Sequence, residues 1–187
     1  MSPPPARNGS SLAVQMPRTF DGDGFRRRAA LLLFRADSLA VLLVHSSKRG
    51  AARWVVPGGG VEPGETPAAC AARELLEESG ARPAAGAPLA PLGAVCDDGA
   101  KRTRTEAFLA RAADAPLDDA YLEAGARGRA WTPLGAARAA LADSPVGAAI
   151  FAAAVGALGL VDADLGDATR CAAAVDALLL RAATARE

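Results

Sequence analysis

The chain has 187 residues and no net charge, because 21 acidic side chains balance 21 basic ones. This length favours one compact domain, and the charge balance excludes a protein whose overall field would attract nucleic acid or an anionic membrane. Aromatic residues make up 4% of the chain, too few for a surface that stacks the bases of single-stranded nucleic acid. Hydrophobic residues make up 51% and many are alanines, so we expect a core of small side chains.

The few cysteines and histidines limit the chemistry further. Cys70, Cys96 and Cys171 have neither the number nor the spacing of a disulfide framework or a zinc site. His45 is the single histidine, which excludes metal sites with two histidine ligands from this chain. The longest apolar stretch, 148–161, is too short to span a membrane. We therefore expect no disulfide partner, no membrane partner and a reducing compartment, the cytoplasm, with the nucleus left open.

The first elements follow from apolar runs and the turns between them. Residues 1–17 are rich in proline and serine, lack the apolar centre of a secretory signal and are expected to be disordered. Apolar runs predict strands at 28–35 and 39–45, joined as a hairpin by a short polar turn. A strand at 54–56 is stopped by the Pro-Gly-Gly-Gly segment 57–60, whose backbone can approach a ligand closely.

The clearest helix is predicted at 67–79, between Thr66 as N-cap and Gly80 as a left-handed stop. Thr132 and Ser144, each followed by proline, are further predicted N-caps. The remaining predicted elements are strands at 92–96, 103–111 and 129–132, and helices at 133–142, 145–158 and 167–185, the last amphipathic. Strands and helices mix without a βαβ repeat, so the predicted class is α+β or a three-layer mixed sheet.

Three carboxylates of the helix at 67–79 carry the functional argument. Glu77 and Glu78 follow Glu74 by three and four residues, so all three carboxylates project from one side of the helix. Like charges at this spacing repel, and a divalent cation with hard oxygen ligands, Mg²⁺ or Mn²⁺, would compensate them. Arg73 lies four residues before Glu77 and can brace that carboxylate. The simpler alternative is an acidic helix face exposed to water.

The surrounding pattern favours the metal site. From Gly59 the spacing runs through Glu65, then Arg73-Glu74-Leu75, then Glu77-Glu78, to Gly80-Ala81. This pattern resembles the Nudix box. The resemblance implies a family of hydrolases acting on pyrophosphates. It implies a domain at 18–158 that folds as an α/β/α sandwich, with a mixed sheet and a loop–helix–loop catalytic box. Residues 159–187 lie beyond the resemblance and are expected to form a helical C-terminal extension. The resemblance also implies that divalent ions are bound by Glu74, Glu77, Glu78 and the carbonyl of Gly58.

Flanking segments resemble one branch of that family, the diphosphoinositol polyphosphate phosphohydrolases. The similar segments are 18–28, 44–48, 54–60, 101–105, 127–131 and 144–146. The resemblance implies phosphate contacts from Arg18, Arg26, Ser46, Lys48, Gly58, Gly59, Gly60, Lys101 and Arg127. Guanidinium, ammonium, hydroxyl and backbone N–H groups of this kind suit a ring crowded with phosphates. Two positions depart from the branch, since Ser144 stands in place of lysine and Ala130 in place of an acidic residue.

The expected function is metal-dependent hydrolysis of phosphoanhydride bonds in diphosphoinositol polyphosphates and also in diadenosine polyphosphates. Either Glu74 or Glu78 would be the general base, while Glu65 and Arg73 would orient the site. The cofactor would be Mg²⁺ or Mn²⁺ and the partner a small-molecule polyphosphate. One alternative is a Nudix hydrolase of dinucleoside polyphosphates, capped RNA or inorganic polyphosphate, capped RNA being the single nucleic-acid partner considered. The other alternative is a polyphosphate-binding module without catalysis.

Overall fold

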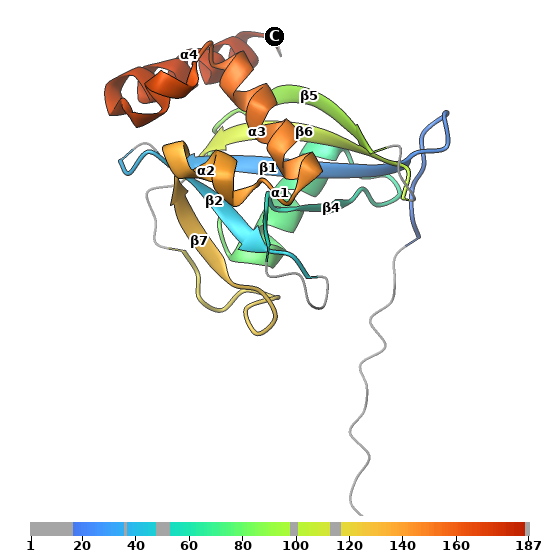
Figure 1. Cartoon of the computed structure of the whole chain (residues 1–187). Coiled ribbons are helices and arrows are strands. Elements are labelled where there is room, and N and C mark those ends of the chain that lie inside the picture. Colours follow the sequence, from blue (N-terminus) through green and yellow to red (C-terminus); the bar gives the residue numbers. More distant parts are fainter. Residues whose placement is uncertain (1–16, 36, 48–52, 98–100, 113–116, 186–187) are drawn as a thin grey trace, which may run out of the picture.

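The computed structural model describes residues 17–35, 37–47, 53–97, 101–112 and 117–185. A mixed sheet lies between helix α1 on one face and helices α2 and α3 on the other (Figure 1). The expected α+β class and three-layer sandwich are thereby confirmed.

Strand β1 is the centre of the sheet. It pairs in parallel with β6 and antiparallel with both β2 and β4. Strand β5 extends the sheet beyond β6, while β3 and β7 both pair with β2. The strands are β1 (Arg26–Arg35), β2 (Ala40–His45), β3 (Trp54–Val55), β4 (Gly58–Gly60), β5 (Ala90–Asp97), β6 (Thr103–Arg111) and β7 (Arg129–Pro133).

The continuous apolar run of β1 is explained by burial on both faces of the sheet. Side chains alternate along a strand, so Leu32 and Phe34 join the core beneath α2 and α3. Leu31 and Leu33 join the core beneath α1. Both cores therefore meet at the strand that carries Arg26 and Arg28 at its beginning.

Helix α1 (Pro67–Ser79) has the predicted bounds and the predicted caps. The Thr66 side chain accepts a hydrogen bond from the Ala69 N–H, and Gly80 adopts a left-handed conformation with φ of 66°. The other helices are α2 (Leu134–Ala140), α3 (Pro145–Ala157) and α4 (Ala168–Thr184), with a short 3-10 turn η1 (Asp162–Gly166) before α4. Ser144 caps α3 as predicted, by accepting a hydrogen bond from the Gly147 N–H.

Two local predictions were wrong. Thr132 does not cap α2, because it lies in β7, and the N-cap is Pro133, which makes no side-chain cap. The glycine segment at 57–60 does not simply stop a strand, since Gly58–Gly60 forms β4 against β1. A Cβ on Gly58 would lie 2.7 Å from the Ala30 Cβ, so only glycine allows this close pairing.

The C-terminal residues pack on the sheet's α3 side. Leu165, Cys171, Val175 and Leu179 belong to the same buried cluster as Leu32. In the part of the chain that the structure describes, no helix is long and apolar enough to cross a membrane. Cys70, Cys96 and Cys171 all have free thiols.

Candidate active site

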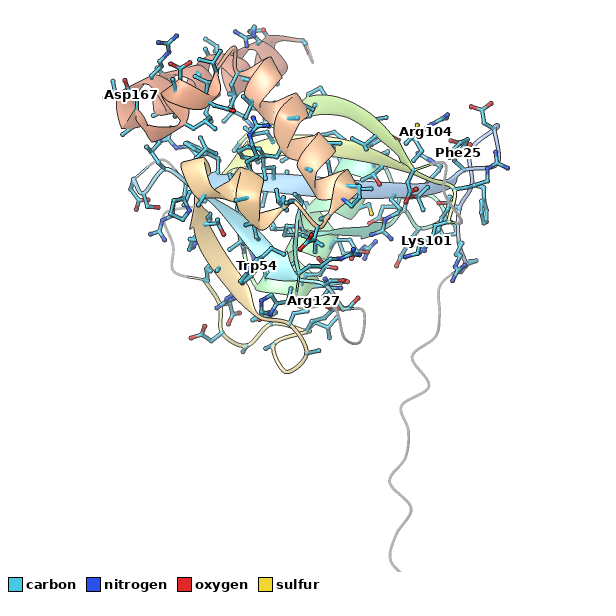
Figure 2. The ribbon with its side chains drawn as sticks, in the orientation of Figure 1. Phe25, Trp54, Lys101, Arg104, Arg127 and Asp167 are labelled. Atoms are coloured by element: carbon cyan, nitrogen blue, oxygen red, sulfur yellow. The ribbon has the colours of Figure 1, made fainter. Side chains whose placement is uncertain are left out.

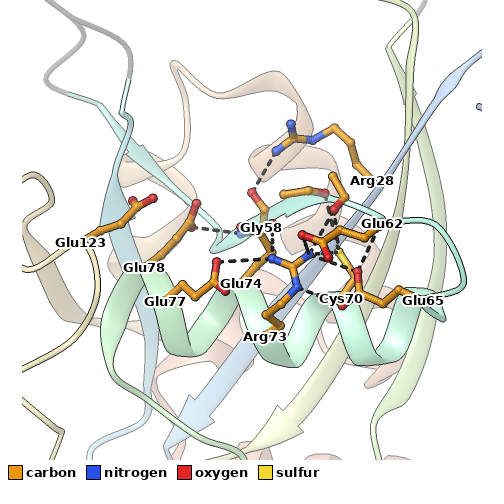
Figure 3. Close-up of polar contacts among 12 residues, drawn as sticks. Arg28, Gly58, Glu62, Glu65, Cys70, Arg73, Glu74, Glu77, Glu78 and Glu123 are labelled. Atoms are coloured by element: carbon orange, nitrogen blue, oxygen red, sulfur yellow. Dashed lines mark hydrogen bonds and ion pairs between the residues drawn. The ribbon is translucent and has the colours of Figure 1, made fainter. Parts of the chain in front are cut away.

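Arg73 is the centre of the acidic face of α1. Its Nε lies 2.9 Å from Oε1 of Glu65, and its Nη2 lies 3.0 Å from Oε2 of the same carboxylate. Its Nη1 contacts Glu74 Oε1 at 3.0 Å and Glu77 Oε2 at 3.3 Å (Figure 3). The predicted contact with Glu77 is present, but the two-pronged pair with Glu65 is the stronger geometry. One guanidinium therefore fixes three carboxylates.

Hydrogen bonding and burial separate the pKa values of these groups. The hydrogen bond from Arg73 lowers the pKa of Glu65, and the same bond raises the pKa of Arg73. Burial raises the pKa of Glu74, against the lowering effect of Arg73. Glu65 is thus held as an anion, whereas Glu74 is easier to protonate.

Glu78 is set apart from the other carboxylates by its burial. Its side chain is only 4% exposed. Its Oε2 accepts a hydrogen bond of 3.1 Å from the Gly58 N–H, and its Oε1 lies 2.8 Å from Nη2 of Arg127. Burial raises the pKa of Glu78 to about 7, although Arg127 and the Gly58 N–H both act to lower it.

The segment before β7 closes the site over the C-terminal end of α1. The Glu123 N–H donates to the Glu77 carbonyl at 3.1 Å, and the Arg129 guanidinium donates to the Ser79 carbonyl. The Glu123 carboxylate pairs with Nε of Arg127. Sequence reasoning missed Glu123, since no local signal places this segment against α1.

Basic residues gather around the glycine strand β4. Nη2 of Arg28 donates to the Gly58 carbonyl at 2.9 Å. The Arg26 guanidinium lies beside Gly60, and its buried Nε has no hydrogen-bond partner among the described residues. Burial lowers the pKa of Arg26, and the nearby charges of Arg28 and Arg18 lower it further. Such a group is stabilised by an incoming anion.

A pocket of about 650 Å³ lies between the sheet and the N-terminal end of α3. Gly58 and Arg127 line it, and each also contacts Glu78, so the pocket adjoins the acidic face of α1. Its lining residues are Arg28, Ala29, Ala30, Ser47, Arg53, Val55, Val56, Gly58, Val95, Cys96, Asp97, Lys101, Thr103, Thr105, Arg127, Ser144, Pro145, Val146, Gly147, Ala149 and Ile150.

The pocket brings together some of the predicted substrate contacts. Lys101 and Arg127 line it from different segments, the turn before β6 and the residues before β7 (Figure 2). Arg18, Arg26 and Ser46 do not line it. Lys48 lies outside the described residues.

Two lining arginines were missed by the sequence reasoning. Arg28 was passed over although it follows Arg26 in the same basic run. Arg53 reaches the pocket with Nη1 3.1 Å from the Asp143 carbonyl. The alternation of the strand was the available signal for Arg28, because Arg26 and Arg28 share a face.

Ser144 and Ala130, the two residues that depart from the expected pattern of diphosphoinositol polyphosphate phosphohydrolases, lie in different parts of the structure. Ser144 is buried and lines the pocket, so the missing lysine removes a charge from the pocket itself. Ala130 lies in β7 opposite Leu43 of β2 and does not line the pocket. Its effect is therefore on sheet packing.

The oxygens of Glu74, Glu77, Glu78 and the Gly58 carbonyl fit a divalent cation by their chemistry, because Mg²⁺ and Mn²⁺ prefer hard oxygen ligands. Among residues 17–185 as far as they are described, no three such side chains are already grouped closely enough to hold a metal ion. Each carboxylate is paired with an arginine instead. A cation at this site would therefore compete with the guanidinium groups for carboxylate oxygens.

Comparison with known proteins decides the family. The model of the NUDIX domain matches residues 24–153. The chain belongs to the Nudix family. The matched range includes α1 and the loop before it, where Arg73 contacts Glu65, Glu74 and Glu77.

Curated relatives resemble part of this Nudix chain. Diphosphoinositol polyphosphate phosphohydrolase 2 of Rattus norvegicus is 51% identical over 65 residues, 35% of this chain and 36% of the relative. Diphosphoinositol polyphosphate phosphohydrolase 3-alpha of Homo sapiens is 49% identical over 65 residues, 35% of this chain and 40% of the relative. The match thus spans well under half the length of these relatives.

Solved structures share the fold. A Caenorhabditis elegans Ap4A hydrolase in a binary complex has a TM-score of 0.52 and 22% identity, covering 71% of this chain and 98% of the other. A structure from a study of MutT from Aliivibrio salmonicida and Vibrio cholerae has a TM-score of 0.52 and 21% identity, covering 67% and 98%. At these identities the similarity concerns the fold alone.

Proposed function

We propose that this Nudix domain is a divalent-metal-dependent pyrophosphohydrolase that cleaves phosphoanhydride bonds of diphosphoinositol polyphosphates, and also of diadenosine polyphosphates. Membership of the Nudix family supports an enzyme acting on pyrophosphates. The observation that carries the finer proposal is the pocket beside Glu78, which is lined by Arg28, Arg53, Lys101 and Arg127.

The charge of the pocket favours a small, highly anionic substrate. Among the described lining residues, four side chains are cationic, one, Asp97, is acidic, and none is aromatic. Guanidinium groups bind phosphates through paired hydrogen bonds, whereas a nucleobase is commonly held by stacking on an aromatic ring. A phosphorylated inositol therefore fits this lining better than a dinucleotide. The partial match to diphosphoinositol polyphosphate phosphohydrolases supports the same choice.

We assign the metal ligands to Glu74, Glu77, Glu78 and the carbonyl of Gly58. Bound Mg²⁺ or Mn²⁺ would supply neutralisation of the phosphate oxygens and a water of lowered pKa. Glu74 and Glu78 are the two candidates for accepting the proton of the attacking water, since both carboxylates are shielded from solvent. Arg73 keeps Glu74 and Glu77 in place, and Glu65 keeps Arg73 in place.

Phosphate contacts are divided between two regions in this proposal. Arg28, Arg53, Lys101 and Arg127 bind phosphates inside the pocket. Arg18, Arg26 and Ser46, with the backbone of Gly59 and Gly60, contribute from outside it, and Lys48 is also assigned a phosphate contact. The Nε of Arg26, which has no hydrogen-bond partner in the part of the chain that the structure describes, supports this second region. We also propose that the protein resides in the cytoplasm, with the nucleus as an additional location.

The test compares substrates at fixed Mg²⁺. Purified protein is incubated with diphosphoinositol pentakisphosphate or with a diadenosine polyphosphate, and the products are quantified. We expect a higher kcat/KM for the inositol substrate, and Arg53→Met, which keeps the bulk of the side chain, should lower kcat/KM for it more than for the dinucleotide. A preference for dinucleotides, capped RNA or inorganic polyphosphate would favour the other hydrolase function. Tight binding without any product would favour a binding module.

A further inference from the structure

Arg127 links the acidic face of α1 to the pocket. Its Nη2 pairs with Glu78 at 2.8 Å, its Nε pairs with Glu123, and its Nη1 lies 3.3 Å from the His45 carbonyl. The side chain is 9% exposed and also lines the pocket. One buried guanidinium is thus shared between a proposed metal ligand and a second carboxylate.

The two carboxylates differ in their exposure and their anchoring. Glu78 is 4% exposed, whereas Glu123 is 35% exposed and lies four residues before Arg127. The Glu123 backbone is fixed to α1 through the Glu77 carbonyl. Glu123 can therefore keep its ion pair with Arg127 while the environment of Glu78 changes.

Cation binding and this ion pair compete for the same oxygen. A carboxylate oxygen that accepts a guanidinium N–H is not free to bind a divalent cation in the same direction, and two positive charges repel at close range. A cation bound to Glu78 from the side that faces Arg127 would therefore displace the guanidinium from that carboxylate. A buried guanidinium that loses its carboxylate is costly unless another carboxylate holds it.

We propose that Glu123 is a positioning residue, which holds the Arg127 guanidinium when a divalent cation displaces it from Glu78 and keeps it directed at a substrate phosphate in the pocket. This inference rests on the proposed function for the identity of the cation and of the phosphate. It assigns the Glu123–Arg127 pair a role that neither residue performs alone.

The first test measures Mn²⁺ binding to the whole chain by electron paramagnetic resonance, without substrate. Glu123→Gln should weaken Mn²⁺ binding several-fold, because Arg127 then has only Glu78 as its carboxylate. Arg127→Met should strengthen it by removing the competitor. Asp119→Asn is the matched control, since it removes a negative charge from the same segment but pairs with Arg129. It should leave Mn²⁺ affinity unchanged.

The decisive comparison is the double variant. If Glu123 acts through Arg127, Glu123→Gln should have no further effect on Mn²⁺ affinity in the Arg127→Met background. An undiminished effect in that background would overturn the inference, because Glu123 would then act on the cation directly. Arg127→Gln, which retains an amide donor for the His45 carbonyl, provides a second background if Arg127→Met fails to fold.

A second readout separates this inference from the proposed function. Inositol hexakisphosphate, which has no phosphoanhydride bond, is titrated in the presence of saturating Mn²⁺. Glu123→Gln should weaken its binding several-fold, and Glu123→Asp should restore part of the loss. Equal affinities for Glu123→Gln and the unmodified chain would contradict the positioning role. Absence of hydrolysis by the unmodified chain would instead contradict the proposed function. The Mn²⁺ and inositol hexakisphosphate affinities can both be measured whether or not the chain hydrolyses a substrate.

Discussion

At the scale of single residues, three glutamates that look equivalent in the sequence have different environments. Glu74 and Glu77 share one guanidinium, whereas Glu78 is buried and bound to Arg127 and to the Gly58 N–H. The spacing along α1 predicted that all three lie on one side. The spacing could not predict that Glu78 has a different environment from Glu74 and Glu77, because its partners Arg127 and Gly58 are distant from α1 in the chain.

Glu78→Gln should lower turnover by about 10²-fold or more while leaving the fold intact, since the amide cannot serve as an anionic ligand or accept a proton. The measurement is kcat for the proposed substrate with circular dichroism as the fold check. Glu106→Gln is the control, because Glu106 makes only a long ion pair of 3.8 Å with Arg27. Full metal-dependent activity in Glu78→Gln would contradict the assignment.

The raised pKa of Glu78 predicts a pH dependence of stability in the metal-free chain. Between the ordinary value of 4.5 and about 7, the folded state retains a proton that the unfolded state has released. The free energy of unfolding should therefore fall as the pH rises through this window and level off above it. Denaturant unfolding in a chelator tests this, and Glu78→Gln should show a shallower fall. An identical slope in both proteins would contradict the account.

At the scale of elements, local signals predicted more than long-range ones. The bounds of α1 and β6 were predicted as observed, and the caps Thr66, Ser144 and Gly80 were correct. Strand β4 was not predicted, because a run of three glycines has low strand propensity and forms a strand here only through pairing with β1.

The residues of the candidate site also divide into those predicted from local patterns and those that depend on long-range contacts. The helix carboxylates and Arg73 were found from spacing within one element, and Lys101 and Arg127 from the family resemblance. Glu123 and Arg53 depend on how separate segments meet, and a single sequence contains no signal for that, whereas strand alternation was an available signal for Arg28. Resemblance also could not show that Arg127 pairs with Glu78.

Gly80 offers a test of how the end of α1 is held. Its φ is 66°, and a Cβ there would lie 3.1 Å from the Tyr121 Cβ and still closer to the Asp118 carbonyl oxygen. Gly80→Ala should lower the free energy of unfolding by more than the roughly 1 kcal/mol expected from a left-handed alanine alone. Gly86→Ala is matched in conformation, with φ of 70°, but meets nothing within 4 Å. Equal losses in the two variants, measured by denaturant unfolding, would contradict this packing.

At the scale of the whole molecule, the segment after α3 completes the core. Helix α4 and η1 contribute Leu165, Val175 and Leu179 to the buried cluster under α3. The proposed boundary at 158 therefore marks where the resemblance to the Nudix family ends. The residues after it still belong to the same hydrophobic core as the domain. Arg111 of β6 also forms an ion pair of 2.6 Å with Asp176 of α4.

Two neighbouring leucines of α4 test this integration. Leu179 is 7% exposed and Leu180 is 67% exposed. Leu179→Ala should lower the free energy of unfolding by about 2–3 kcal/mol, since it leaves a cavity in the core. Leu180→Ala should change it by less than about 0.5 kcal/mol. Similar stabilities for the two variants would show that α4 does not contribute to the common core.

The most direct test of the whole account is phosphate release from diphosphoinositol pentakisphosphate as Mg²⁺ is titrated into metal-free protein. Because the proposed reaction requires a divalent cation held by the carboxylates of α1, we predict no release without Mg²⁺ and a saturable rise with it. Release that does not depend on a divalent cation, or no release at any Mg²⁺ concentration, would contradict the central claim.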